Sequence, residues 1–287
     1  MRIALAVAIP AILLAGNKPA EHVNAVTIVA TEYAFQAPQE LAPGPTSFRF
    51  QNNGKVFHEF NIFLLKPGVT LDYFVSTRGG GIPAASLMER HVGVLFSAPG
   101  KTSSSELTTR LLPGRTYAII CNLTDNPKAK PHFTLGMYKG IHVRGVAAPA
   151  RNTSTPPVMR ATFFTDTIIG SDYSFKYPTT ITPGHHTFLF RNAGTVRHEV
   201  NMVLLKKGAT VAQIVELAKN GGDPFSLVED DTPGVLLAQP GESPNGQIDN
   251  NFLPGRDYGI LCTFQNDDKS PPHFALGMSG TIHVAEK

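Results

Sequence analysis

The chain repeats itself once, and this repeat constrains the fold more than any other feature. Tyr33-Ala34-Phe35 recurs as Tyr173-Ser174-Phe175, an offset of 140 residues (173 − 33). Pro131-His132-Phe133 recurs as Pro272-His273-Phe274, at an offset of 141 (272 − 131). A period this long indicates two duplicated whole domains, because solenoid repeats are much shorter.

Composition and a linker agree with two domains. The chain has 287 residues, of which 42% are apolar and 16% charged, so each copy is large enough to bury a core. Residues 146–158 are rich in Ala, Pro, Ser and Thr, which is typical of a linker. The sequence therefore predicts domains at residues 26–145 and 159–287.

Each copy is patterned mainly as strands. His58, Phe60 and Ile62 fall on one face at period two, and so do Tyr117 and Cys121. Short strands separated by Pro-Gly turns predict an all-β antiparallel sandwich or barrel in each copy. One short helix is expected in a long connection of the second copy, at residues 211–219, where a Gly-Gly pair follows as a stop signal.

Four residues with metal-binding chemistry recur at matching spacings. A His at a strand start is followed by a Cys 63 or 64 residues later (121 − 58; 262 − 198), and then by a second His and a Met. Two imidazoles and a thiolate, with a thioether as weak axial ligand, make up the ligand list of a blue-copper site. The sequence predicts two mononuclear copper sites, with these ligands: His58, Cys121, His132 and Met137; His198, Cys262, His273 and Met278.

These motifs resemble those of cupredoxins, the superfamily that includes plastocyanin, azurin and nitrite reductase domains. The resemblance covers about residues 26–145 and 159–285, and it implies two tandem Greek-key sandwiches with a type 1 copper in each. Glu59 and Glu199 depart from it, since many cupredoxins have an Asn there that ties the ligand loops together. The loop of ten residues between Cys and second His is nearer in length to that of nitrite reductase domains.

Simpler roles compete for several of these residues. Cys121 and Cys262 form a disulfide only if equivalent strand ends of two domains meet with Cα atoms within about 7 Å, so free thiols are expected. Ordinary core packing is the alternative role of the two Met residues. The second His of each copy is expected nearest the solvent. The other histidines are expected at the surface: His91, His142, His185, His186 and His283.

The ligand set favours an electron carrier over an enzyme, because four protein ligands leave no open position for a substrate. A nitrite reductase or multicopper oxidase needs additional His ligands, often beside the Cys or in His-x-His pairs, and neither pattern occurs here. Copper storage or delivery is a further alternative, although the chain has only six Met and no Met cluster. Redox proteins are the expected partners.

The N-terminus predicts export. Arg2 precedes an apolar run over residues 3–16, which as a helix is too short for a hydrocarbon core of about 30 Å. This pattern is typical of a signal peptide at residues 1–25, with cleavage after Ala20 or Ala25; the alternative is an uncleaved membrane anchor. We expect a periplasmic or extracellular protein. Nucleic-acid binding is not expected, since the net charge is only +3.

Overall fold

The computed structural model of the chain describes residues 23–77, 84–126, 128–145, 164–267 and 269–287. The predicted linker, residues 146–158, and most of the predicted signal peptide lie outside these ranges. The last three residues of that peptide, 23–25, are described, and Asn24 and Ala25 already belong to the first strand, where they pair with Thr46 and Ser47. None of the helices in the described ranges combines the length and the apolar character that a membrane crossing needs.

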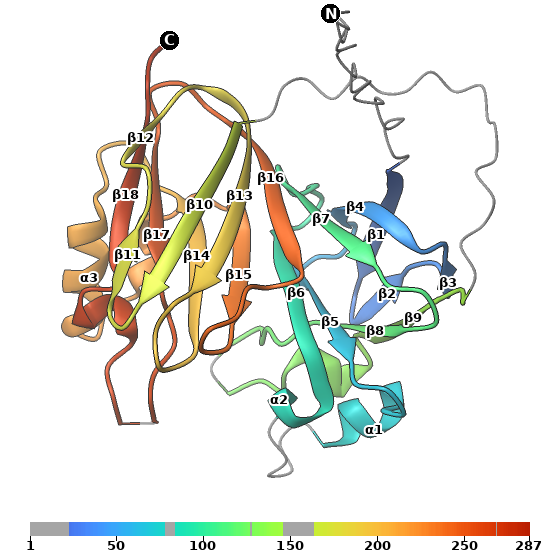
Figure 1. Ribbon diagram of the computed structural model, residues 1–287. Coiled ribbons are helices and arrows are strands. Elements are labelled where there is room, and N and C mark those ends of the chain that lie inside the picture. The colour runs from blue at the N-terminus through green and yellow to red at the C-terminus, as the bar shows by residue number, and fades with distance from the viewer. Residues whose placement is uncertain (1–22, 78–83, 127, 146–163, 268) are drawn as a thin grey trace, which may run out of the picture.

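The first half folds into two facing sheets (Figure 1). One sheet has the order β7-β4-β1-β2, with strands β1 (Asn24–Thr31), β2 (Ala34–Gln36), β4 (Gly44–Asn52) and β7 (Glu106–Leu111). The other has the order β6-β5-β8-β9-β3, with strands β3 (Glu40–Leu41), β5 (His58–Leu65), β6 (Met88–Ser97), β8 (Thr116–Ile120) and β9 (Tyr138–Val143). The connections carry α1 (Leu71–Ser76), α2 (Ala84–Leu87) and the 3-10 turn η1 (His132–Leu135).

The second half repeats this plan. Its first sheet has the order β11-β10-β13-β16, with strands β10 (Phe164–Ser171), β11 (Ser174–Lys176), β13 (Gly184–Asn192) and β16 (Gly246–Phe252). Its second has the order β12-β18-β17-β14-β15, with strands β12 (Thr180–Ile181), β14 (His198–Leu204), β15 (Gly234–Ala238), β17 (Asp257–Leu261) and β18 (Ser279–Val284). The connections carry α3 (Val211–Lys219), η2 (Pro224–Leu227) and η3 (His273–Leu276).

The prediction of two all-β sandwiches is confirmed, and so is the helix at 211–219, which is α3. This helix begins in a capping box, in which Thr210 and Gln213 satisfy each other's backbone N–H groups. The expectation of purely antiparallel sheets is wrong. β1 pairs parallel to β4, and β10 parallel to β13. A period-two pattern shows which face of a strand is buried, and it is the same for parallel and antiparallel neighbours.

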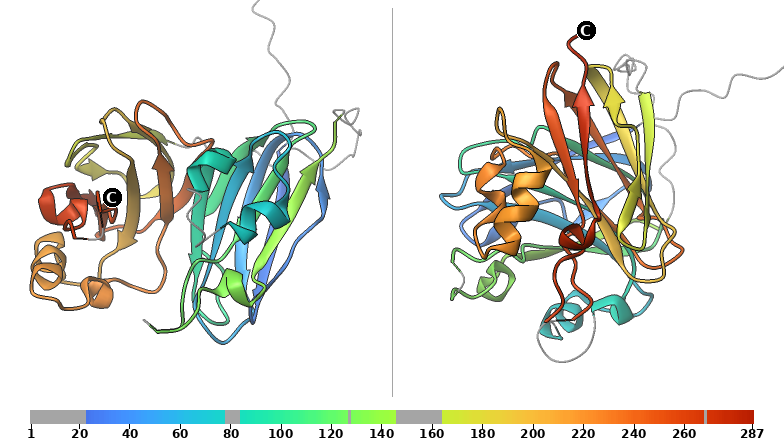
Figure 2. Two further views of the ribbon diagram at one scale, coloured as in Figure 1. Left: turned by 90° about the horizontal axis from the view of Figure 1, so that it is seen from below. Right: turned by 90° about the vertical axis from the view of Figure 1, so that its left-hand side faces the viewer.

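The sheets of the two halves join edge to edge, so the molecule has one sheet of eight strands and one of ten. β7 pairs with β16, and β6 with β15, both antiparallel. Figure 2 shows the two sandwiches side by side. Gly246 permits this approach, because a Cβ added there would lie 2.3 Å from the carbonyl oxygen of Val92. The sequence did not predict this junction.

Strand β5 is buried along its whole length, which places its first residue, His58, in the interior. Phe60 and Ile62 face the main core between the two sheets, as the period-two pattern predicts. Phe63 and Leu65 face the opposite side, where Phe74 of α1 covers them. A strand covered on both faces positions a side chain at its end firmly, because neither face is free to relax into solvent.

Two expectations about surface histidines are wrong. His91 is 5% exposed and His186 is 2% exposed, because His91 packs against the Phe63 ring and His186 against the Phe252 ring. Each is hydrogen-bonded there: the Nε2 atom of His91 lies 2.8 Å from Asn61 Oδ1, and the Nδ1 atom of His186 lies 2.7 Å from Asp166 Oδ2. The expected exposure of the others is confirmed for His142, His185 and His283.

Candidate metal centres

Strand pairing brings the first His and the Cys of each half together. His58 is the first residue of β5, and Cys121 directly follows β8. These two strands are antiparallel neighbours, with Asn61 opposite Ile120, so the start of one lies beside the end of the other. β14 and β17 repeat this arrangement in the second half and bring His198 to Cys262.

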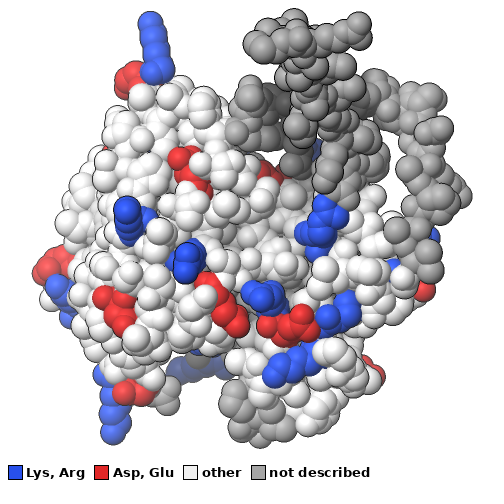
Figure 3. Space-filling view, viewed as in Figure 1, with Lys and Arg blue, Asp and Glu red and all other residues white. Residues whose placement is uncertain are grey.

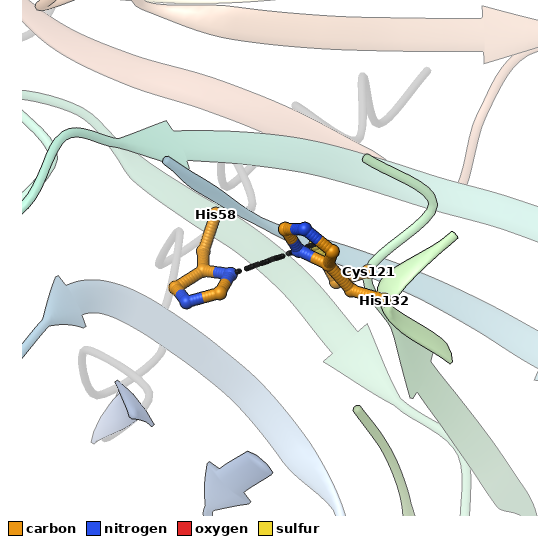
Figure 4. Close-up of side chains that lie close together, drawn as sticks. All are labelled: His58, Cys121 and His132. Carbon is orange, nitrogen blue, oxygen red and sulfur yellow. Dashed lines mark hydrogen bonds between the residues drawn. The ribbon is translucent and has the colours of Figure 1, made fainter. Parts of the chain in front are cut away.

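The three donor atoms of the first half converge (Figure 4). The Nδ1 atoms of His58 and His132 lie 3.2 Å apart. Cys121 Sγ lies 3.3 Å from the Nδ1 atom of His132 and 3.9 Å from that of His58. All three residues are buried, with at most 1% of their surface exposed.

The second half has almost the same geometry. The Nδ1 atoms of His198 and His273 lie 3.2 Å apart, and Cys262 Sγ lies 3.8 Å and 3.4 Å from them. An ion held trigonally at about 2.0 Å from nitrogen and about 2.3 Å from sulfur separates its donors by roughly 3.5 Å and 3.7 Å. Both groups of donor atoms therefore fit a single metal ion of that size.

Backbone hydrogen bonds hold the second His beside the Cys. His132 N–H donates to the Leu123 carbonyl at 2.9 Å, and Phe133 N–H donates to the Cys121 carbonyl at 2.9 Å. The η1 turn then ends at Gly136, whose φ of 110° suits glycine. The corresponding bonds of His273 and Phe274 measure 2.8 Å each.

The same loop returns each Met to the Cys. Cys121 N–H donates to the Met137 carbonyl at 3.1 Å, and Cys262 N–H donates to the Met278 carbonyl at 3.1 Å. Both Met side chains are fully buried. Each sandwich thus presents a His at a strand start, a Cys at the end of the neighbouring strand, and a His and a Met on the loop that follows. Both halves are cupredoxin-like domains.

Comparisons with known proteins return cupredoxin folds among solved structures. No protein-family model matches the chain, and no curated protein matches it. Dithionite-reduced auracyanin from Roseiflexus castenholzii is 28% identical over 44% of this chain and 99% of its own, with a TM-score of 0.31. The copper-containing nitrite reductase of Thermus scotoductus is 12% identical over 92% of this chain and 62% of its own, with a TM-score of 0.26. A multicopper oxidase is 13% identical over 92% and 88%, with a TM-score of 0.24.

In the metal-free protein, burial shifts the pKa values of the two thiols and of the His58 imidazole. It raises the pKa of the Cys121 and Cys262 thiols to about 12, and the nearby Glu59 and Glu199 carboxylates add to the shift. Burial, followed by the proximity of His132, lowers the pKa of His58 to about 4. A metal ion must therefore displace a proton from each thiol, whereas the His58 imidazole is already neutral at pH 7.

Residues that support the second His were not predicted from the sequence. His132 Nε2 lies 3.0 Å from Asp125 Oδ1, and the Tyr33 hydroxyl donates to Asp125 Oδ2 at 2.6 Å. In the second half His273 Nε2 lies 3.0 Å from Asn266 Oδ1, and Asn266 donates to the hydroxyl of Tyr173 at 2.7 Å. The repeated tyrosine was the available signal, since Tyr33 and Tyr173 recur at the offset of the duplication.

The second His of each site, which the sequence analysis expects nearest the solvent, is itself buried. His132 and His273 are each only 1% exposed, because the loop folds over them. Asp125 and Tyr33 cover the outer edge of the first imidazole, and the Tyr33 ring lies edge-on to it at 5.0 Å. The apolar residues that follow the second His differ in exposure. Phe133 and Phe274 are buried, whereas Leu135 and Leu276 are 45% and 44% exposed.

The two sites differ in the partner of the first His. His198 Nε2 lies 3.0 Å from Asp172 Oδ1. His58 Nε2 is buried, and no hydrogen-bond partner for it exists within the described part of the chain. Each site therefore has one carboxylate on an imidazole, but on the second His in the first half and on the first His in the second half.

Proposed function

We propose that the protein is an exported electron carrier with one type 1 copper in each half. The observation that carries this proposal is the pair of buried His-Cys-His groups, whose donor atoms converge within 3.9 Å before any ion is added. Nitrogen and thiolate donors suit copper in both oxidation states. A donor set already in position changes little when the ion gains or loses charge, which favours rapid electron transfer.

His58, Cys121 and His132 would hold one copper, with the Met137 thioether as a fourth, weaker ligand, and the equivalent residues would hold the other. Bound copper would supply one-electron redox chemistry. The protein contributes by excluding water and by directing an N–H group at each sulfur: Glu59 N–H lies 3.5 Å from Cys121 Sγ, and Glu199 N–H 3.5 Å from Cys262 Sγ. Such bonds stabilise a thiolate and tune its metal.

Export and redox partners belong to the same proposal. The N-terminal pattern of Arg2 and a short apolar run supports passage out of the cytoplasm. On the face shown in Figure 3, the basic and acidic side chains of the described residues are interspersed. Weak electron-transfer complexes use small interfaces, so such encounters need no extended patch of one charge.

Copper loading of single-site variants tests the carrier function. The full-length protein should bind two copper ions and absorb strongly in the visible range, as copper-thiolate sites do. Cys121→Ser and Cys262→Ser should each remove one copper and about half of the absorption, since each group lies within one half. A colourless protein that readily releases copper(I) would favour storage instead, and turnover of nitrite or oxygen would favour an enzyme.

Export is tested separately by expressing the complete chain and sequencing the N-terminus of the protein recovered outside the cytoplasm. Cleavage near Ala20 or Ala25 supports a signal peptide. Retention of an intact N-terminus in the membrane fraction would support an anchor.

A further inference from the structure

A cavity of about 370 Å³ lies between the two halves. Phe57 and Phe96 line it from the first half, and Asn201, Val203 and Thr232 from the second. Cavities of roughly 300–1,000 Å³ with apolar walls and a few polar groups are the usual sites for small molecules. The metal centres do not use this cavity.

The duplication explains why the cavity exists. Val203 and Thr232 correspond to Phe63 and His91 of the first half, which lie opposite each other on β5 and β6. There the two rings pack edge to face, with centroids 5.0 Å apart. In the second half Thr232 lies just before β15, outside the strand pairing, and neither Val203 nor Thr232 carries a ring. The second half therefore has no side chain that corresponds to the His91 imidazole, and the cavity lies beside these two residues.

The hydrogen bonding of Asn201 also differs from that of its counterpart in the first half. Its counterpart Asn61 has Oδ1 2.8 Å from Nε2 of His91. In the second half Thr232 replaces this His, and Asn201 Oδ1 is a buried acceptor without a hydrogen-bond partner in the part of the chain that the structure describes. A buried acceptor in that condition costs free energy, which a ligand with a suitable donor would recover.

We propose that the cavity binds a small planar aromatic molecule that carries one N–H or O–H donor. The ring occupies the position of the His91 imidazole, and its donor bonds to Asn201 Oδ1. Phe57 and Phe96, whose rings stack 6.2 Å apart, form an aromatic wall. Glu229 and Asp230 also line the cavity, so it favours a neutral molecule such as a phenol over an anion.

One molecule should bind per chain. The counterpart of this cavity lies where Met88 and His91 meet Leu237 of the second half. It measures only about 200 Å³, and charged side chains including Lys66 and Glu89 line it. The larger cavity adjoins the first metal centre, since Phe57 immediately precedes His58.

The proposal is tested by titrating the intact protein with phenol and monitoring binding by ligand-observed NMR. Anisole is the matched control, because it has the same ring and an oxygen but no donor. We expect one phenol per chain and binding about tenfold tighter than that of anisole, as one hydrogen bond to a buried acceptor provides. Equal binding of the two molecules, or no phenol binding, would overturn the proposal.

Two variants locate the site. Thr232→His combined with Val203→Phe rebuilds the ring pair of the first half, and it should abolish phenol binding. Asn201→Ala should keep ring binding and remove the preference for phenol over anisole. If the double variant binds phenol as the parent does, or if the preference survives Asn201→Ala, the site lies elsewhere. Binding does not require copper, so its failure would leave the carrier function untouched.

Discussion

Glu59 Oε1 accepts two hydrogen bonds from Asn122, one from its backbone N–H at 2.8 Å and one from its side-chain amide at 2.6 Å. Glu59 follows His58, and Asn122 follows Cys121, so the pair joins two strands immediately behind the candidate metal centre. Glu199 makes the equivalent contacts with the N–H and hydroxyl groups of Thr263. A carboxylate thus ties the ligand segments together where many cupredoxins have an amide.

Removing this acceptor should weaken the fold around the first centre. In Glu59→Ala the Asn122 N–H loses its partner, and we expect the metal-free protein to lose about 1–3 kcal/mol of unfolding free energy. Urea denaturation measures the change. Glu59→Gln is the control, because its amide oxygen still accepts from Asn122, and its loss should be smaller. If both variants lose the same amount, the negative charge matters and not the hydrogen bonds.

The two His-Cys-His groups could be predicted from the sequence because the first His begins a strand, the Cys directly follows one, and the set occurs twice. Period two placed His58 and Cys121 on inward faces, and the duplication showed that the spacing was not accidental. Asp125 and Asp172 carried no such signal, since they lie in loops and differ from their counterparts, Asn266 and Glu32. The joining of sheets was equally hidden, because side-chain alternation does not reveal which strand edges pair.

The carboxylates on the imidazoles should tune the two coppers separately. The Asp125 carboxylate accepts the Nε2–H of His132 and makes this ligand more basic, which favours copper(II). Asp125→Asn should therefore raise the reduction potential of the first site by tens of mV, since a tenfold change in relative affinity is about 59 mV for one electron. Redox titration of each copper band measures the shift.

Asp172→Asn is the matched variant for the second site, because Asp172 holds His198 in the same way. It should raise the potential of the second copper and leave the first unchanged. A shift of both potentials in either variant would contradict the view that each carboxylate acts only on its own centre.

The metal-free protein should lose stability in acid because of His58. The pKa of His58 is lowered from about 6.5 to about 4 in the folded state. Its contribution to the free energy of unfolding is therefore present above pH 6.5 and is lost as the pH falls toward 4. We expect a decrease on the order of 1–3 kcal/mol over this range. Urea denaturation at several pH values measures it.

His58→Gln should reduce this loss of stability between pH 6.5 and 4. His142→Gln, which changes an exposed histidine, should leave the loss unchanged. An unchanged loss in His58→Gln would show that other groups control acid stability. At high pH the sign reverses: the thiols of Cys121 and Cys262, with pKa raised to about 12, contribute fully below about pH 9 and lose their contribution as the pH rises through 12.

The junction of the two halves depends on a glycine where a side chain has no room. Gly246 of β16 lies opposite Thr109 of β7, and a Cβ there would meet the Val92 carbonyl oxygen at 2.3 Å. Gly246→Ala must push the strands apart, at a cost of about 1–3 kcal/mol. Since the sheets run through this junction, calorimetry of the metal-free parent should show one unfolding transition, and the variant a lower or divided one. Gly145→Ala is the control, because nothing lies within 4 Å of a Cβ at that position. A Gly246→Ala protein that melts like the Gly145→Ala protein would show that the halves do not stabilise each other through this edge.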